Sequence, residues 1–140
     1  MPLHSIQRSW GGTTASEAGR IAEDASAQFL QQQGVQLLYR NYRGPSGEID
    51  LIGIDADTVC FVEVRARKND KFLNPVVSIS SRKQRRIVDT ARCFISQQPF
   101  AGISGNPCRF DVIVLIYQRV DGPLLTWYKD AFRVPSSLQS

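Results

Sequence analysis

Histidine and cysteine are scarce in this sequence, which has one histidine and three cysteines. The cysteines, Cys60, Cys93 and Cys108, form no CxxC pair, and no second histidine completes a zinc cluster. Their odd number and wide spacing argue against a disulfide framework, so we expect buried thiols in a reducing compartment. The sequence also supports neither a Ser/His/Asp nor a Cys/His nucleophile system.

Long apolar runs and phosphate-binding loops are missing as well. The longest strongly apolar run, residues 112–117, is far shorter than the roughly 20 residues that a membrane-spanning helix needs. The N-terminus lacks a signal-peptide pattern, and no GxxxxGK[ST] loop is present. We therefore predict a cytoplasmic protein with no membrane partner.

Acidic residues are the minority among the charged side chains. Lys and Arg number 17 against 13 Asp and Glu, which gives a net charge of +4. This excess suits a nucleic-acid partner, because Lys and Arg contacts to phosphate release counterions. Many basic proteins bind no nucleic acid, however, so charge alone leaves this question open.

The pattern that is present is typical of one α/β domain. A chain of 140 residues has the usual size of a single domain. Residues 1–13 show no apolar period and predict a flexible N-terminal arm, so the domain covers residues 14–140. A capping box begins a first helix that Gly34 ends, and Ser80 or Ser81 caps a second. Runs rich in β-forming residues predict strands at residues 35–42, 48–54, 59–67, 110–117 and 124–128.

The hairpin of the second and third predicted strands carries the candidate site. A symmetric turn around residues 55–58 places Asp50 opposite Glu63 and Glu48 opposite Arg65. One face of the hairpin is then apolar, and the other presents the charged side chains. Directly opposed like charges destabilise a sheet unless something offsets them. A divalent cation is the natural offset, since Mg²⁺ commonly binds one or two carboxylates together with waters and phosphate oxygens.

A solvated sheet face is the other interpretation of these charges. In that case Glu48 pairs with Arg65, while Asp50 and Glu63 are tolerated in water. Asp50 and Glu63, however, interrupt otherwise apolar strings, where a solvated face more often uses Thr, Lys or Gln. We therefore favour the metal site.

The same segments carry a resemblance to a known family. The chain has GEIDLI at residues 47–52, FVEVR at 61–65, GRIAE at 19–23, NYR at 41–43, KQ at 83–84 and RFDV at 109–112. In this combination it resembles the YraN family, which is similar to PD-(D/E)XK restriction-endonuclease-like and Holliday-junction-resolvase-like nucleases. The resemblance implies a restriction-endonuclease-like three-layer α/β fold, with a mixed central β-sheet flanked by α-helices. It also implies metal-dependent hydrolysis of phosphodiester bonds.

The resemblance assigns expected roles to individual residues. Asp50 and Glu63 match the acidic residues of the motif and Glu23 adds a carboxylate, so these three are the expected ligands of Mg²⁺ or Mn²⁺. Arg65 stands where the motif normally has Lys, and Gln84 can orient water or phosphate. The expected catalytic residues are therefore Asp50, Glu63, Arg65 and Gln84. Glu23 as a solvated helix charge and Gln84 as a helix-start hydrogen bond remain open alternatives.

Basic residues gather around the start of the second predicted helix. Such a run is usually a solvated face, but cations at a helix start oppose the macrodipole, which favours a phosphate-binding role. The expected nucleic-acid-binding residues are Arg43, Arg65, Arg67, Arg82, Lys83, Arg85 and Arg86. For Asp111, an ion pair with a neighbouring arginine is favoured over a role as a ligand.

Three functions remain open on the sequence alone. The first is a metal-dependent nuclease, an endonuclease by resemblance, that acts on DNA or structured RNA, with DNA favoured. Arg65 is effectively always charged and cannot act as a general base, so the second is a catalytically weakened or inactive nucleic-acid-binding module. The third is a protein-interaction domain that keeps the nuclease fold. Resolvase-like relatives act as symmetric dimers, so the resemblance also implies a homodimer.

Overall fold

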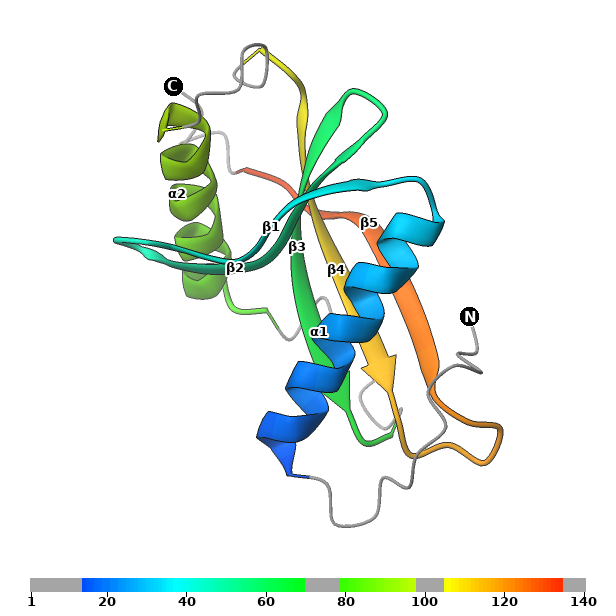
Figure 1. The fold of residues 1–140 in the computed structure, drawn as a ribbon. Coiled ribbons are helices and arrows are strands. Elements are labelled where there is room, and N and C mark those ends of the chain that lie inside the picture. The colour runs from blue at the N-terminus through cyan, green and yellow to red at the C-terminus, as the bar shows by residue number, and fades with distance from the viewer. Residues whose placement is uncertain (1–13, 70–78, 98–104, 135–140) are drawn as a thin grey trace.

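The computed structural model describes residues 14–69, 79–97 and 105–134. The predicted N-terminal arm, residues 1–13, lies outside these ranges. Helices and strands follow one another along the described chain as shown in Figure 1. They are α1 (Ala15–Gln32), β1 (Gln36–Gly44), β2 (Gly47–Asp55), β3 (Thr58–Arg67), α2 (Ser81–Gln97), β4 (Cys108–Ile116) and β5 (Leu124–Phe132).

The strands form one sheet in the order β1-β2-β3-β4-β5. β3 and β4 run parallel, and the other neighbouring pairs run antiparallel. Parallel neighbours need a crossover connection, and α2 lies between β3 and β4 along the chain. The sheet is therefore mixed, as predicted.

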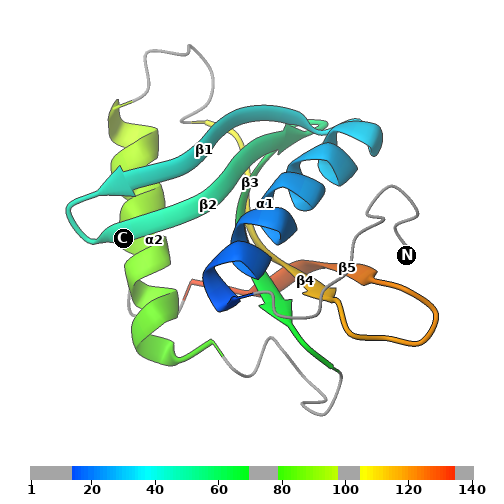
Figure 2. The same ribbon diagram turned by 60° about the horizontal axis from the view of Figure 1, so that its bottom comes forward.

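The two helices cover opposite faces of this sheet (Figure 2). Buried residues of α1 pack with Leu51, Val62 and Ile113, whereas buried residues of α2 pack with Phe61 and Val112. Successive residues of β4 thus belong to different cores, which explains why its sequence is almost continuously apolar. The α/β fold with a mixed sheet between helices is confirmed.

Both helices begin at capping residues that the sequence predicts. Thr14 Oγ1 and Ser80 Oγ each accept a hydrogen bond of 3.1 Å from the backbone N–H three residues later. The cap at Ser80 places Lys83 in the first turn of α2. Gly34 follows the end of α1 with a φ of +90°, a conformation that glycine adopts without a steric penalty. Neither described helix is long and apolar enough to cross a membrane.

β5 is longer than the predicted strand, residues 124–128, and its additional residues include a bulge. The register between β4 and β5 shifts between Phe110 and Val112, and Asp130 has a φ of +54°. The Asp130 N–H donates a hydrogen bond of 2.9 Å to Asp111 Oδ1, so a side chain satisfies the displaced backbone. The residues at the bulge are polar and break the apolar alternation, so the sequence did not predict this part of the strand.

Gly53 is a position of β2 with little room for a side chain. A Cβ there would lie 2.7 Å from Val35 Cγ1 and 3.0 Å from the Gln36 carbonyl oxygen. We expect Gly53→Ala to lower the free energy of unfolding by about 1–3 kcal/mol through overpacking, as measured by chemical denaturation. Gly19→Ala is the matched control, because nothing lies within 4 Å of a Cβ on that helical residue. This control should be neutral or stabilising by up to about 1 kcal/mol, and an equal loss in both variants would contradict the steric explanation.

Candidate functional site

β2 and β3 pair only near the turn that connects them. Their ladder runs from Asp55–Thr58 to Leu51–Val62, and over these residues it has the predicted register. Beyond this point the Val64 N–H donates a 2.8 Å hydrogen bond to Asp50 Oδ2. The Asp50 carboxylate therefore accepts the hydrogen bond that a main-chain carbonyl of β2 would accept if the β2–β3 ladder continued.

Two predicted cross-strand pairs are absent from the described ladder. Asp50–Glu63 and Glu48–Arg65 would both continue it beyond its observed end. Glu48 instead lies opposite Arg43 of β1, with 3.6 Å between Glu48 Oε2 and Arg43 Nε. The expectation of one apolar and one charged face was also wrong, because helices bury apolar residues on both faces of this hairpin.

The end of the ladder coincides with a bend in the β1–β2 hairpin. The pairs Arg40–Leu51 and Tyr42–Ile49 keep one register, and Asn41, which lies between them, has a φ of +53°. Ile49 and Ile52 both pack in the core under α2, whereas Leu51 packs under α1, so the alternation of faces breaks at Asp50. Figure 2 shows the hairpin leaving β3 and crossing over α2. At this bend the Asp50 side chain reaches the backbone of β3.

Asp50 is half-buried and lies in a negatively charged environment. Burial, followed by repulsion from Glu63 and more weakly from Glu23, raises the pKa of its carboxyl group to about 7. The Val64 N–H and the Lys83 ammonium act in the opposite direction without cancelling this increase. Asp50 therefore titrates near neutral pH, a property that is concentrated at functional sites.

Glu63 is buried and forms a close ion pair with a residue of α2. Its side chain is 8% exposed, and its Oε1 lies 2.7 Å from Lys83 Nζ. Lys83 is 43% exposed, so its ammonium group reaches the carboxylate from the surface. We refer to Asp50, Glu63 and Lys83 together as the acidic site.

Arg65 follows Glu63 by two positions in β3, so the two side chains leave the strand on the same face. Burial lowers the pKa of its guanidinium group, as does Arg67, whereas Glu63 and Asp50 raise it. An arginine starts from so high a pKa that it remains charged. Arg65 thus adds a permanent positive charge beside the acidic site.

Glu23 and Gln84 come from helices on opposite faces of the sheet. Glu23, on α1, lies 3.7 Å from the Arg40 guanidinium and acts electrostatically on Asp50. Gln84 Nε2 donates a 3.0 Å hydrogen bond to the Ile79 carbonyl oxygen, which is the helix-start alternative considered for it. Glu23 is therefore close enough to the acidic site to act on it electrostatically. The Gln84 amide instead forms its hydrogen bond with the backbone just before α2.

The acidic site offers carboxylate oxygens as ligands for a hard cation. Among the residues that the structure describes, no three His, Cys, Asp or Glu side chains form a ready metal cluster. Two carboxylates nevertheless suit Mg²⁺ or Mn²⁺, because such ions complete their coordination with waters and phosphate oxygens. The Lys83 ammonium held against Glu63 also marks this position as one that accepts positive charge. Asp50 and Glu63 therefore offer the type of oxygen ligand that a divalent cation takes.

The remaining predicted basic residues lie on α2 and near the strand ends. The exposed ones in the first turns of α2 are Arg82, Arg85 and Arg86. The β1–β2 turn packs on the same helix, since a Cβ on Gly47 would lie 3.7 Å from Arg86 Cβ. Arg43, beside this turn, is exposed, whereas Arg67 ends β3 and donates a hydrogen bond to the Ala66 carbonyl oxygen. Arg43 and the α2 arginines thus lie on elements that pack together.

Asp111 is fully buried in a second charged cluster. Arg109 Nε donates to Asp111 Oδ1 at 2.9 Å, and Trp127 Nε1 donates to Asp111 Oδ2 at 3.0 Å. Arg109 also contacts Asp55 at 3.0 Å. The favoured interpretation of Asp111 as an ion-pair partner is confirmed. The sequence did not predict the hydrogen bond from Trp127 to Asp111. This bond joins β5 to β4, and it depends on how the two strands pair.

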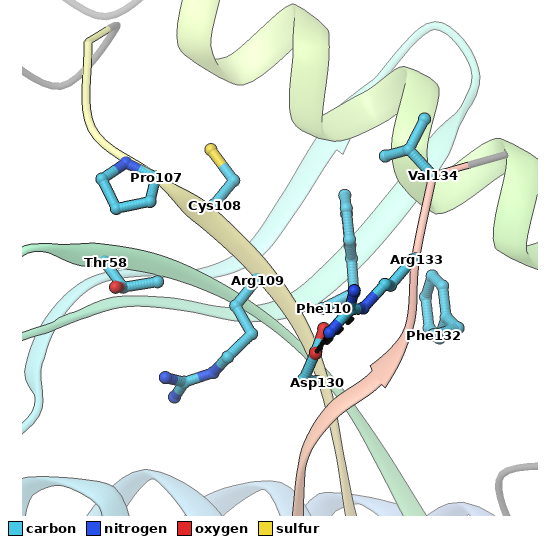
Figure 3. Close-up of a pocket in the computed structure, with 9 residues that line it drawn as sticks. All are labelled: Thr58, Pro107, Cys108, Arg109, Phe110, Asp130, Phe132, Arg133 and Val134. Carbon is cyan, nitrogen blue, oxygen red and sulfur yellow. Dashed lines mark hydrogen bonds and ion pairs between the residues drawn. The ribbon is translucent and has the colours of Figure 1, made fainter. Parts of the chain in front are cut away.

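The pocket in Figure 3 lies beside the start of β4 and the end of β5. It has a volume of about 430 Å³, and Asp130 and Arg133 form a 2.8 Å ion pair in its wall. None of the residues of the acidic site lines it. Cys108, which does line it, is exposed, and Cys93 is half-buried, so the prediction of buried thiols holds only for Cys60.

These features define an α/β protein in which a buried and a half-buried carboxylate lie between a mixed sheet and a basic helix start. The profile of the Uncharacterised protein family UPF0102 matches residues 22–115. A UPF0102 protein of Pseudomonas putida strain GB-1 is 46% identical over 117 residues, which cover 84% of this chain and 94% of that relative. A UPF0102 protein of Nitrosomonas europaea is 43% identical over 121 residues, which cover 86% of this chain and 97% of that relative. The chain belongs to the UPF0102 (YraN-like) family, so the resemblance in its motifs is confirmed.

The raised pKa of Asp50 predicts a pH-dependent stability. A carboxyl group with a pKa of about 7 when folded and near 3.8 when unfolded binds its proton more tightly in the folded protein. Its contribution to stability is therefore complete below about pH 4 and is lost as the pH rises to about 7. Asp50→Asn removes this titration. The variant should exceed the wild type in stability by on the order of 2 kcal/mol at about pH 8, and the difference should disappear toward pH 4.

Urea denaturation of both proteins across this pH range measures the effect. Asp121→Asn is the control, because Asp121 is exposed at a turn. Its difference from the wild type should stay constant over the range. A difference between Asp50→Asn and wild type that does not change with pH would contradict the raised pKa.

Asp111→Asn tests the structural role of the second cluster. The substitution removes one of the two carboxylates that contact the half-buried Arg109, and it disturbs the contacts with Trp127 and the bulge. We expect a loss of about 3–5 kcal/mol in the free energy of unfolding. Asp89→Asn, at an exposed ion pair of α2, should change stability by less than about 0.5 kcal/mol. Equal stabilities for the two variants would rule out a central structural role for Asp111.

Proposed function

We propose that the protein is a metal-dependent nuclease that hydrolyses phosphodiester bonds in nucleic acid, in DNA in preference to RNA. The observation that carries this proposal is the pair of carboxylates, Asp50 and Glu63, held beside Lys83 and Arg65. A sheet that serves only a structural role gains nothing from two carboxylates whose mutual repulsion helps raise the pKa of one of them to about 7. A divalent cation together with an anionic phosphate would balance the charges of all four side chains.

The proposed metal ligands are Asp50 and Glu63, with Glu23, which acts electrostatically on Asp50, as a third carboxylate. An ion of Mg²⁺ or Mn²⁺, when bound, polarises a phosphoryl group and lowers the pKa of a water molecule. Arg65 is suited to hold the scissile phosphate through two parallel hydrogen bonds and to stabilise the charge that develops on it. Gln84 is assigned a positioning role, because its amide group secures the start of α2.

The proposed reaction breaks one phosphate ester bond and forms a new bond between phosphorus and the oxygen of a water molecule. The oxygen of a water molecule attacks phosphorus as the bond to the leaving sugar oxygen breaks. The attacking water releases a proton to solvent, and the leaving oxygen takes one up. Asp50 binds a cation only when ionised, so the affinity for the metal ion should increase as the pH rises toward about 7.

The basic residues fit contacts to the phosphate backbone better than recognition of bases. Exposed arginines on α2 and Arg43 beside the β1–β2 turn lie on elements that pack together. Contacts of this kind position nucleic acid without reading its sequence. They also make binding weaker as the salt concentration rises.

Metal binding and cleavage together test the proposal. Mn²⁺ is titrated by calorimetry into wild-type, Asp50→Asn and Glu63→Gln protein, and each protein is incubated with duplex, single-stranded and branched DNA and with structured RNA. The wild type should bind Mn²⁺ and cleave at least one substrate. Each variant should lose cleavage by on the order of 100-fold or more, because one of two ligands is gone. Asp89→Asn, which removes a carboxylate from the exposed part of α2, should keep both activities.

Cleavage that persists in Asp50→Asn and Glu63→Gln would refute the proposed site. Salt-dependent binding of nucleic acid without cleavage would instead support a nucleic-acid-binding module. Arg65 is the observation that favours this second function, since its charge is permanent where the motif has a lysine. Absence of both metal and nucleic-acid binding would leave a protein-interaction domain.

The family resemblance extends the proposal to assembly and location. We propose a symmetric homodimer, which sedimentation of the full chain tests. We also propose a cytoplasmic location, which the free thiols of Cys60, Cys93 and Cys108 support.

A further inference from the structure

The Lys83 ammonium group lies where a metal ion would neutralise Glu63. Its Nζ is 2.7 Å from Glu63 Oε1, and its charge also lowers the pKa of Asp50. The Lys83 ammonium group therefore acts electrostatically on both proposed metal ligands, Asp50 and Glu63. A metal ion that binds these carboxylates has to compete with it.

Lys83 is placed so that it can change partners. Its side chain is 43% exposed although the carboxylate it contacts is 8% exposed. Its own backbone N–H is held by the cap Ser80, so the start of α2 stays fixed while the side chain moves. A lysine at a helix start also gains nothing from the helix dipole. The long, flexible stem can therefore carry the ammonium away from Glu63 without any change in the backbone.

Arg65 is not an equivalent cation. It extends directly from β3, its guanidinium is partly buried, and its planar fork suits a fixed phosphate contact. The site thus combines one fixed and one exchangeable positive charge. The exchangeable charge comes from a helix, although the motif places its lysine on the strand.

We propose that Lys83 is an exchangeable cation of the acidic site: it neutralises Glu63 in the metal-free protein and moves to a non-bridging oxygen of the substrate phosphate when a metal ion binds. This inference rests on the proposed nuclease function. It changes the role of Lys83 from a general contact to the nucleic-acid backbone to a contact with the reacting phosphate. It also makes metal affinity and cleavage respond in opposite directions when the ammonium is removed.

Calorimetric titration of Mn²⁺ tests the competition directly. Metal-free wild-type, Lys83→Met and Arg92→Met proteins are titrated at about pH 8, above the pKa of about 7 of Asp50. Lys83→Met keeps an apolar stem and removes the competing charge, so it should bind Mn²⁺ on the order of 10-fold more tightly. Arg92→Met removes one positive charge from a later, exposed position of α2, and its affinity should stay within about twofold of the wild type.

Cleavage at saturating Mn²⁺ tests the second half of the exchange. Lys83→Met should cleave on the order of 100-fold more slowly than the wild type, because the phosphate loses a cationic contact. Lys83→Arg restores a charge at this position and should recover part of the rate. A residue that only stabilises the fold would weaken metal binding and cleavage together, so the opposite signs distinguish the two roles. Should Lys83→Met fail to fold, Lys83→Gln, which can still donate a hydrogen bond to Glu63, replaces it in both measurements.

The outcomes separate this inference from the function on which it rests. If Asp50→Asn abolishes Mn²⁺ binding while Lys83→Met binds as the wild type does or more weakly, the exchange is overturned and the nuclease proposal stands. If neither the wild type nor Lys83→Met binds Mn²⁺ and neither cleaves, the nuclease proposal fails and the exchange fails with it. Tighter Mn²⁺ binding with slower cleavage supports both.

Discussion

The hydrogen bond from the Val64 N–H to the Asp50 carboxylate marks the place where β2 leaves β3. On one side of it the two strands form a regular antiparallel ladder, and on the other side β2 stays with β1 while β3 continues beside β4. A half-buried carboxylate in this role is costly unless its charge is balanced, because it is partly removed from water and is repelled by Glu63. The architecture of the sheet and the electrostatics of the acidic site are therefore set by the same side chain.

A second aspartate, Asp111, shows what a purely structural solution looks like in the same sheet. It also accepts a hydrogen bond from a displaced backbone N–H, that of Asp130 at a bulge. Its remaining oxygen capacity is taken up by Arg109 and Trp127, so a fully buried carboxylate has both charge and hydrogen bonds satisfied. Asp50 accepts a hydrogen bond from the Val64 N–H and is repelled by Glu63, and burial together with this repulsion raises its pKa to about 7. This contrast distinguishes the candidate functional site from an ordinary buried charge.

Local chemistry was sufficient to predict much of the fold. Capping hydroxyls, the glycine after α1, the apolar run of β4 and the short turn before Thr58 are all encoded within a few neighbouring residues. The bend at Asn41 and the bulge at Asp130 were not predictable, because both residues adopt positive φ values without being glycine, and tertiary contacts impose that conformation. The predicted pairing of Asp50 with Glu63 assumed an undistorted ladder. The two residues belong to one site, but the bend and not the register brings them together.

The contact between Lys83 and Glu63 shows most clearly what a motif leaves out. A pattern read along β3 finds Arg65 where a lysine is expected and suggests a weakened catalytic site. The charge balance of a site, however, depends on which groups meet in space, and the first turn of α2 delivers an ammonium to the same carboxylate. A helix start is an electrostatically poor place for a lysine, so this position is better explained by the carboxylate it faces than by the stability of the helix. The arginine at position 65 is therefore a weak argument against activity, because the strand and the helix together supply both kinds of cation that a phosphate-handling site uses.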